Sequence, residues 1–326
     1  MEIEKVLSAF KKLKILIIGD VMADAYLTGT VDRVSPEAPV PIVNVTKKEF
    51  RPGGAANVAL NVSALGATPV LCSVVGEDVM GGELISTLPD YGISTKYLIA
   101  TRERKTTVKT RVIAQNQQIL RFDEEDTFEL DVKASKSLLK QVRYLVNETD
   151  IDAILFQDYN KGILTEKVIR EVLLLAIRKD IPTIVDPKHQ QFFTYKRATL
   201  FKPNLKEVND NLPFSVSATL QHLTKATEYI NRQLNNEMTL ITLSDKGIFY
   251  SQKEERKILP TIPRNIADVC GAGDSVVSVA ACALAIGLPL PEIALLANLA
   301  GGQVCEQVGV VPVSAKQLIS DYEQLE

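Results

Sequence analysis

The amino-acid sequence predicts an α/β fold in which a mostly parallel sheet is covered by helices on both faces. Short apolar runs rich in β-branched residues recur along the chain, and such runs are typical of buried strands. These runs are residues 15–18, 70–75, 153–156, 183–185 and 240–243. Segments between them repeat apolar residues at helical spacing, as Val58, Val62 and Leu65 do. Strands that alternate with helices favour a parallel sheet between two helical layers.

The composition is that of a soluble globular chain and excludes several classes of function. The 326 residues are 46% hydrophobic and 24% charged, with a net charge of −3. No basic block is present, so nucleic acid is not an expected partner. No apolar run approaches the roughly 18 residues of a membrane span, and the N-terminus lacks the features of a signal peptide. The four cysteines form no C-x-x-C pair and fit a reducing cytoplasm, which is the expected location.

Two segments depart from the alternation of strands and helices. Residues 23–50 are rich in proline and alternate polar with apolar residues. Residues 105–124 are typical of a β-hairpin that turns near 115–117. Together the segments predict a small β-lid beside the main sheet, within a single domain that spans residues 1–326. Exposed strand edges invite pairing with another chain, so a homodimer is also expected.

A glycine-rich turn near the C-terminus is where the sequence indicates chemistry. The segment Asp268-Val-Cys-Gly-Ala-Gly-Asp274 leads into a run that is apolar almost all round, which is typical of a buried helix. Gly271 and Gly273 allow a tight turn, and the free N–H groups and dipole of a helix N-terminus favour a bound anion. Asp274 beside such an anion suits a general base that takes a proton from an attacking hydroxyl. The plainer alternative is an acidic residue favoured only by the helix dipole. The glycine patterns of Rossmann and Walker motifs do not fit this segment.

Three motifs together resemble those of the ribokinase-like carbohydrate kinases. Arg51-Pro-Gly-Gly-Ala-Ala-Asn57 resembles the family's Gly-Gly motif, and Asn204-Leu-Lys-Glu207 resembles its N-x-x-E motif. The segment that ends at Asp274 resembles its C-terminal signature. The three occur in the family's order, and the similarity covers nearly the whole chain. The resemblance implies a ribokinase-like three-layer sandwich with a small β-lid, ATP as the phosphoryl donor and Mg²⁺ as a cofactor.

Finer matches are similar to one branch of that family, the kinase half of bifunctional heptose enzymes. These matches are Gly19-Asp-Val-Met-Ala-Asp24, Arg33-Val-Ser-Pro-Glu-Ala-Pro-Val-Pro41, Asn116-Gln-Gln and Asp158-Tyr-Asn-Lys-Gly162. The resemblance implies phosphorylation of D-glycero-β-D-manno-heptose 7-phosphate at O1, a step towards ADP-heptose for lipopolysaccharide. Cys270 and Ser275 depart mildly from the usual signature. No nucleotidyltransferase half with an H-x-G-H motif is present, so a separate enzyme is expected to add the nucleotide.

The resemblance also assigns roles to individual residues. Expected at the transferred phosphoryl group are Asp274 as catalytic base and the amides of Gly271, Ala272 and Gly273. Expected to bind the sugar, near the carboxyl end of the first strand, are Asp20, Asp24, Gly53, Gly54 and Asn57. Expected to hold the distal phosphate are Arg33, Ser35, Lys161 and Lys188. Expected around the nucleotide are Asn204, Glu207, Ser244, Lys246, Gly247 and Asn298. Glu207 is also expected to hold Mg²⁺, directly or through water.

Plainer alternatives stay open for several of these residues and for the function. Asn204 and Glu207 also suit a helix cap, residues 244–247 a β-turn, and a lone lysine a solvated surface charge. A non-catalytic sugar or nucleotide sensor could have the same fold, because fold does not imply function. Loss of the base would indicate a sensor, and Asp274 is present. Among kinases, the alternative substrates are other sugars or sugar phosphates, such as ribose or a ketohexose.

Overall fold

A nine-stranded sheet forms the centre of the computed structural model, which describes residues 2–115 and 117–325. In sheet order its strands are β13 (Glu255–Leu259), β12 (Ile248–Gln252), β11 (Met238–Thr242), β10 (Leu200–Phe201), β9 (Thr183–Asp186), β8 (Ala153–Gln157), β1 (Lys14–Gly19), β4 (Thr68–Gly76) and β5 (Leu98–Thr101). Every neighbouring pair from β5 to β11 is parallel, whereas β12 and β13 are antiparallel to their neighbours. The mostly parallel sheet is therefore confirmed.

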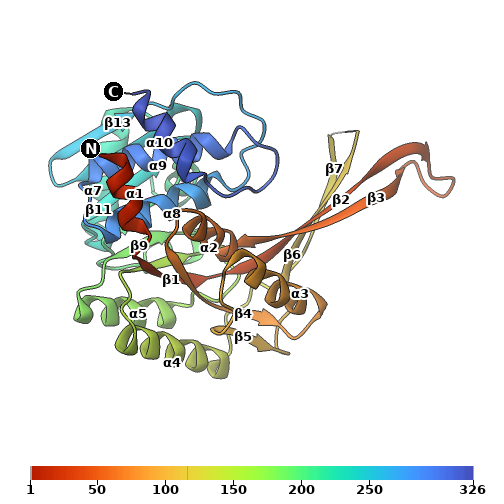
Figure 1. Cartoon of the computed structure of the whole chain (residues 1–326), viewed down its shortest axis with the longest axis horizontal. Helices are drawn as coiled ribbons and strands as arrows, with labels where there is room; N and C mark the ends of the chain where they lie inside the picture. Colours follow the sequence, from red (N-terminus) through yellow and green to blue (C-terminus); the bar gives the residue numbers. More distant parts are fainter. Residues whose placement is uncertain (1, 116, 326) are drawn as a thin grey trace.

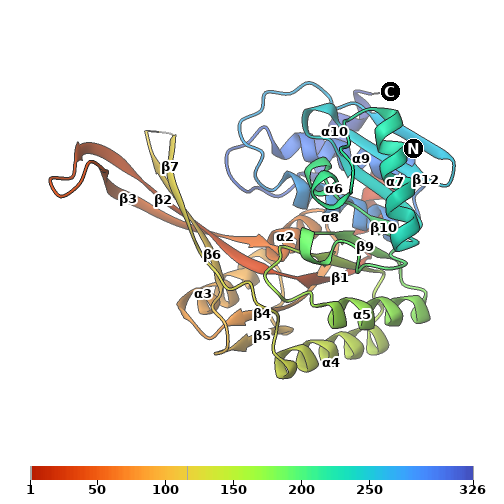
Figure 2. The same cartoon turned by 180° about the vertical axis from the view of Figure 1, so that it is seen from behind.

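Helices cover both faces of this sheet (Figure 1). One layer contains α1 (Ile3–Phe10), α2 (Ala55–Ala64), α3 (Val79–Thr87), α8 (Ala272–Ala285), α9 (Leu290–Val304) and α10 (Ala315–Glu323). The opposite layer contains α4 (Val132–Glu148), α5 (Glu166–Lys179), α6 (Leu205–Asn211) and α7 (Leu220–Leu234). Figure 2 shows α4 and α5 side by side along one face. Short 3-10 turns are η1 (Leu88–Tyr91), η2 (His189–Gln191) and η3 (Ser244–Lys246).

The alternation of side chains along β1 explains why its sequence is apolar throughout. Ile15 and Ile17 pack into the core on the α8 side, and Leu16 and Ile18 pack into the core on the α5 side. Successive side chains of a strand point to opposite faces, so a strand covered on both faces must be apolar at every position. The same reasoning accounts for the three layers that the sequence predicts.

A second sheet of four strands forms the β-lid. In sheet order its strands are β3 (Pro41–Gly54), β2 (Val21–Val34), β6 (Thr107–Ala114) and β7 (Gln117–Glu124). Strand β2 pairs antiparallel with β3 and parallel with β6, and β6 pairs antiparallel with β7. Both segments predicted for a lid enter this sheet, and the outer part of the β2–β3 hairpin projects away from the helical layers (Figure 1). Asn116, at the expected hairpin turn, lies outside the described residues.

Polar side chains gather where neighbouring parallel strands end. Asp20 directly follows β1, Gln157 ends β8, and Asp186 ends β9. The register pairs Gly19 with Gln157 and Gln157 with Asp186. Asp20, Gln157 and Asp186 are all buried. Ligands of open α/β sheets bind outside the carboxyl ends of the strands, so this edge is where a site is expected.

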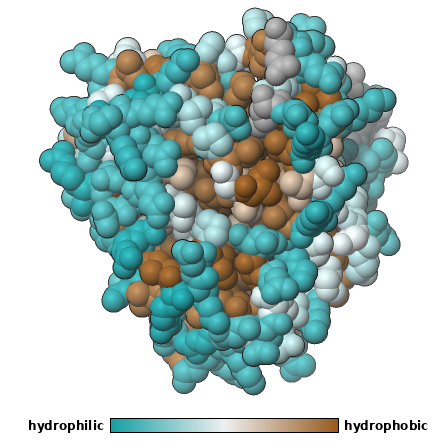
Figure 3. All heavy atoms as spheres, turned by 60° about the vertical axis from the view of Figure 1, so that its left-hand side comes forward, coloured by the Kyte–Doolittle hydropathy of each residue, from teal (hydrophilic) through white to brown (hydrophobic). Residues whose placement is uncertain are grey.

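Across the described part of the chain, no helix is both long and apolar enough to cross a membrane. Figure 3, which brings the left-hand side of Figure 1 forward, shows hydrophilic side chains over most of this face and hydrophobic ones near its centre.

Candidate active site

The glycine-rich turn forms the N-terminal end of helix α8. Gly271 is the N-cap residue and has a φ of 80°, a left-handed conformation that glycine adopts without strain. Gly273 and Asp274 lie in the first turn, where helical N–H groups have no partner inside the helix. A Cβ atom added at Gly273 would meet no atom within 4 Å, so the backbone is open there. Such a turn can hold an anion through backbone N–H groups and the helix dipole.

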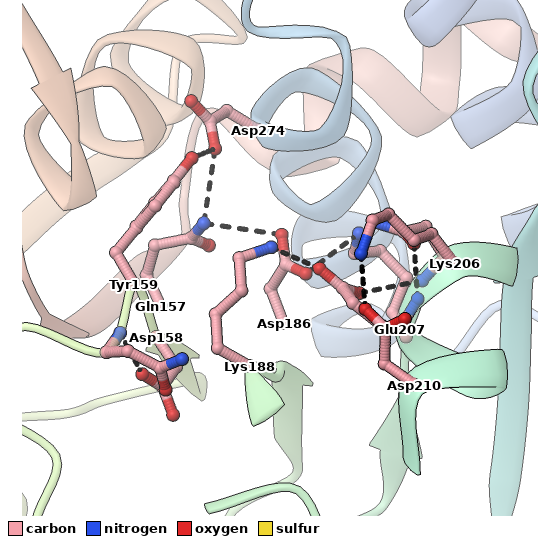
Figure 4. Close-up of polar contacts among 12 residues, drawn as sticks. Gln157, Asp158, Tyr159, Asp186, Lys188, Lys206, Glu207, Asp210 and Asp274 are labelled. Carbon is pink, nitrogen blue, oxygen red and sulfur yellow. Dashed lines mark hydrogen bonds and ion pairs between the residues drawn. The ribbon is translucent and has the colours of Figure 1, made fainter. Parts of the chain in front are cut away.

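Asp274 lies in a buried cluster of hydrogen-bond donors (Figure 4). Its Oδ2 accepts a hydrogen bond from Asn57 Nδ2 at 2.6 Å. Its Oδ1 accepts two, from the Tyr159 hydroxyl at 2.7 Å and from Gln157 Nε2 at 3.1 Å. Each carboxylate oxygen offers about two acceptor positions, so Oδ1 is filled and Oδ2 keeps one position. Oδ2 is therefore the oxygen that can still accept a proton from a substrate hydroxyl.

The surroundings of Asp274 adjust its basicity. Burial raises the pKa of Asp274 to about 6, although the hydrogen bonds from Asn57 and Tyr159 oppose this rise. The charge of Asp186 raises the pKa further, and Lys202 lowers it. A general base works best when its pKa lies near the working pH, and burial is a common way to bring a carboxyl group there. Asp274 is thus ionised at neutral pH and more basic than an exposed aspartate.

A buried ion pair lies next to the base. Asp186 pairs with Lys202 at 3.0 Å, and both side chains are almost fully buried. Gln157 Nε2 also donates to Asp186 Oδ2 at 3.3 Å, so one amide group bridges Asp186 and Asp274. A buried charge is tolerated when it is paired and hydrogen-bonded, and this arrangement satisfies that condition.

Glu207 takes part in a helix cap and in an ion pair. Asn204 Oδ1 accepts from the Glu207 N–H, and Glu207 Oε2 accepts from the Asn204 N–H, both at 2.8 Å. These two bonds form a capping box at the start of α6, which is the plainer alternative for this motif. The remaining oxygen, Oε1, pairs with the Lys188 ammonium group. That ammonium lies 5.4 Å from the centroid of the Tyr159 ring, beside the base.

Carboxylates lie near the base, but the described residues do not provide a complete set of protein ligands for Mg²⁺. In residues 2–115 and 117–325, no group of three or more His, Cys, Asp or Glu side chains could hold a metal ion. Burial, and then the charge of Asp186, raise the pKa of Glu207, so a cation beside these carboxylates would relieve their repulsion. Mg²⁺ usually keeps several waters and binds substrate phosphates. Asp186 and Glu207 fit contact with the ion through such waters.

A cavity of about 740 Å³ opens beside the glycine turn, and Ala272 and Gly273 form part of its wall. Ile248, Ile262 and Val276 give it an apolar lining, which suits a flat heteroaromatic base. Of the residues expected around the nucleotide, those that line the cavity are Asn204, Ser244, Gly247 and Asn298. Lys246 and Glu207 do not line it. The glycine turn therefore separates an apolar cavity from the buried carboxylate of the base.

Asp20 has partners other than those the sequence suggests. Its carboxylate accepts backbone N–H bonds from Tyr159 at 2.7 Å, Lys161 at 3.1 Å and Ile163 at 3.2 Å. Three amide donors on one fully buried carboxylate fix the segment that carries Tyr159. These bonds give Asp20 a positioning role, while Oδ1, which accepts only from Ile163, keeps one acceptor position.

The other residues expected at the sugar lie between the lid and the base. Asp24 of β2 is buried and pairs with Arg111 of β6. Gly53 packs against it so closely that a Cβ would lie 2.2 Å from Asp24 Oδ2. Gly54, with a φ of 58°, is the N-cap residue of α2 and leads into the helical turn that presents Asn57 to the base.

The four residues expected to hold a distal phosphate do not meet at one place. Arg33 and Ser35 lie towards the tip of the β2–β3 hairpin, so this chain does not bring them to the base (Figure 1). Lys161 and Lys188 each pair with a glutamate, Glu125 and Glu207 respectively. All four lie in segments that resemble the same heptose enzymes. That resemblance does not show where in space the tip of a long hairpin lies.

Several residues at the site escape sequence reasoning. Gln157 and Asp186 have one available signal, since both are polar residues that end apolar strand runs. Lys202 has another, because a lysine that directly follows a short buried strand needs a buried partner. Tyr159 lies in the segment 158–162, where an aromatic side chain is as typical of a core as of a site. Its contact with Asp274 spans 115 residues of sequence, which no local pattern reveals.

Known proteins resemble this chain over most of its length. The model of the pfkB family of carbohydrate kinases matches residues 12–317. The chain belongs to the pfkB family of carbohydrate kinases. Two curated relatives are each named Bifunctional protein HldE. The one from Trichlorobacter lovleyi is 39% identical over 98% of this chain, and the one from Helicobacter pylori is 38% identical over 94%. The chain spans 64% and 65% of the lengths of these two relatives.

Solved structures share the fold of this pfkB family member. Phosphofructokinase-2 from Escherichia coli, in complex with substrates and products, has a TM-score of 0.80 and 20% identity, covering 96% of this chain and 99% of its own. Ribokinase from Arabidopsis thaliana, complexed with ribose and ATP, has a TM-score of 0.75 and 17% identity, covering 95% and 98%. The predicted ribokinase-like fold is confirmed. Family membership makes the chain an ATP-dependent sugar kinase, the predicted class of enzyme.

Proposed function

We propose that the chain transfers the terminal phosphoryl group of ATP to O1 of D-glycero-β-D-manno-heptose 7-phosphate. The product is the 1,7-bisphosphate, an intermediate on the way to ADP-heptose and the lipopolysaccharide core, made in the cytoplasm. Two observations support the substrate. Segments such as 33–41 and 158–162 resemble heptose enzymes, and relatives named HldE match 98% and 94% of the chain. A nucleotidyltransferase acts later in the same sequence of reactions.

The observation that carries the proposal is the buried Asp274 beside the glycine turn. Asn57, Gln157 and Tyr159 hold its carboxylate and leave one acceptor position on Oδ2. In the proposed reaction the O1 hydroxyl of the sugar gives its proton to Oδ2 as O1 attacks the γ-phosphorus of ATP, and the bond from that phosphorus to the β–γ bridging oxygen breaks so that ADP leaves. The N–H groups at the start of α8 then stabilise the charge on the transferred group. Mg²⁺, when bound, neutralises negative charge on the phosphates.

The alternatives differ in what they require of this site. A sensor of sugars or nucleotides would not need a buried base with a raised pKa, and Asp274 has both properties. A kinase for ribose or a ketohexose would need the same base but no group to hold a distal phosphate. The distinction between sugar kinases therefore depends on the far end of the sugar.

A coupled ADP-release assay over a small panel of sugars tests the proposal. The panel contains heptose 7-phosphate, fructose 6-phosphate, ribose and fructose, each with Mg²⁺ and ATP. We expect kcat/KM for heptose 7-phosphate to exceed that of both free sugars and of fructose 6-phosphate. Equal values, or a preference for a free sugar, would reject the heptose assignment and leave the kinase fold intact.

A further inference from the structure

At the base of the β-lid, a tyrosine whose ring lies close to two guanidinium groups has a buried hydroxyl without a partner. Tyr26 of β2 is only 7% exposed, and its hydroxyl has no hydrogen-bond partner in the part of the chain that the structure describes. The guanidinium carbon of Arg51 lies 5.2 Å from the Tyr26 ring centroid, and that of Arg111 lies 5.4 Å from it. A buried polar group without a partner is costly, so its presence points to a missing ligand.

The charges of this Tyr26–Arg51–Arg111 cluster do not cancel. Arg111 pairs with Asp24, which neutralises one guanidinium group. Among the described residues Arg51 forms no ion pair, and its Nη1 donates to the carbonyl oxygen of Val310 at 3.1 Å. Glu49, opposite Tyr26 in the register, pairs with Lys47, and that hydrogen bond and then the charge of Arg51 lower its pKa. Three cations, Arg51, Arg111 and Lys47, therefore face two carboxylates, Asp24 and Glu49. Burial, and then the charge of Asp24, raise the pKa of Tyr26, so its hydroxyl stays a donor.

The strand register explains why these side chains face the same space. Asp24 lies opposite Arg51 on one side and Lys109 on the other, and Tyr26 lies opposite Arg111. Residues two apart on a strand share a face, so Arg51, Tyr26 and Arg111 all lie on the face that carries Asp24. A Cβ added at Gly309 would lie 2.7 Å from Arg51 Nη1 and 3.8 Å from the Tyr26 hydroxyl. Arg51 and the Tyr26 hydroxyl thus both pack beside Gly309.

The cluster is close to the catalytic base. Burial is the main cause that raises the pKa of Tyr159, and the charge of Asp24 adds to the rise; the Tyr159 hydroxyl binds Asp274. Cys270, directly before the glycine turn, is within reach of the charges of Arg111 and Asp24. None of the three cluster residues lines the 740 Å³ cavity. The cluster therefore shares no residue with the lining of the cavity expected to hold the nucleotide base.

We propose that Tyr26, Arg51 and Arg111 bind the phosphoryl group that the sugar substrate already carries at its far end. The inference rests on the proposed function for the identity of that sugar. A phosphate dianion requires positive charge and hydrogen-bond donors. The cluster supplies guanidinium groups whose positive charge the nearby carboxylates do not fully neutralise, and a neutral hydroxyl donor. Nucleotides also carry phosphoryl groups, so the test must separate the two sources.

Steady-state kinetics of Arg51→Ala and Tyr26→Phe separate these sources. Phenylalanine keeps the ring under both guanidinium groups and removes only the hydroxyl, so folding is preserved even if the arginine variant unfolds. For Arg51→Ala we expect KM for heptose 7-phosphate to rise roughly 10- to 150-fold, the loss typical of a charged hydrogen-bond partner. For Tyr26→Phe we expect a rise of about 10-fold. KM for ATP should stay nearly unchanged in both variants.

The matched control is Lys48→Ala, which removes an exposed cation from β3, the strand that carries Arg51. Lys48 lies opposite Leu27, on the other face of the strand from Arg51, so its loss should leave both KM values unchanged. Unchanged KM for the sugar phosphate in folded Arg51→Ala and in Tyr26→Phe would overturn the proposal. An equal rise in KM for ATP would also overturn it, because the cluster would then serve the nucleotide.

Inorganic phosphate gives a readout that does not depend on the heptose. With ADP saturating, phosphate should raise the melting temperature of the wild type and of Lys48→Ala, but raise that of Arg51→Ala and Tyr26→Phe much less. The same rise in all four proteins would contradict an anion site at this cluster. If heptose 7-phosphate is not turned over but the rise in melting temperature with phosphate still depends on Arg51, the proposed function is wrong and the anion site is supported. If it is turned over with unchanged KM in Arg51→Ala, the anion site alone fails.

Discussion

Removing the Tyr159 hydroxyl should shift the pH dependence of the reaction. Tyr159→Phe deletes the donor that binds Asp274 Oδ1 at 2.7 Å and keeps the ring that packs beside Lys188. That hydrogen bond stabilises the ionised form of Asp274 and lowers its pKa, so its loss must raise the pKa. The base works only when ionised. The acidic limb of the profile of kcat/KM against pH should therefore move to higher pH.

The size of the shift follows from the strength of one hydrogen bond to a charged group. Such a bond contributes about 1.5–3 kcal/mol, and one pKa unit corresponds to about 1.36 kcal/mol. The pKa of Asp274 is about 6 in the intact site. Loss of the Tyr159 donor should raise it by about one to two units, since Gln157 and Asn57 still bind the carboxylate. At neutral pH the variant then falls to a fraction of wild-type activity, which returns as the pH rises.

The assay is kcat/KM for the sugar substrate from about pH 5 to pH 9, which reports groups of the free enzyme. Tyr195→Phe is the matched control, because the Tyr195 hydroxyl is buried and also binds a carboxylate, that of Asp158, at 2.8 Å. The control should keep the wild-type acidic limb. Superimposable limbs for Tyr159→Phe and the wild type would refute the role given to this hydroxyl. A uniform loss of activity at every pH would refute it too, since that outcome indicates misplacement and not a changed pKa.

Two further predictions concern the metal and the assembly. Excess chelator should abolish activity. Glu207→Gln should raise the Mg²⁺ concentration needed for half-maximal activity, because one of the two nearby carboxylates loses its charge. If the Mg²⁺ titration curves of the variant and the wild type superimpose, Glu207 does not contact the metal. The lid should pair with that of a second chain, because exposed strand edges favour pairing and Leu120 and Phe122 of the edge strand β7 are 56% and 42% exposed. Light scattering at micromolar concentration should give a dimer, and a monomer would contradict this pairing.

Local patterns in the sequence were enough to predict the architecture. The apolar runs of β1, β4, β8, β9 and β11 stand out because strands buried on both faces cannot alternate. The lid segments stand out for the opposite reason, since each lid strand has a face that is not packed in the core. The glycine turn at 271–273 and the apolar helix after it also follow from local rules on backbone freedom and burial.

The partners of the site residues could not be predicted in the same way. Asn57 binds Asp274 across 217 residues of sequence, and Asp20 binds backbone groups about 140 residues away. Such contacts depend on which strands become neighbours, and the order of strands is not encoded by any single segment. Arg33 illustrates the limit, because a motif identifies its loop but not the distance of that loop from the base.

The turnover of Asp274→Asn tests the central claim most directly. Asparagine keeps the shape of the side chain and cannot accept the proton, so kcat should fall roughly 10²- to 10⁴-fold, the usual contribution of general acid–base catalysis. Binding of ATP, followed by its effect on the melting temperature, should persist because Asp274 does not line the 740 Å³ cavity. A loss of kcat of this size with ATP binding intact is the predicted result. Near-normal turnover in the folded variant would show that Asp274 is not the base.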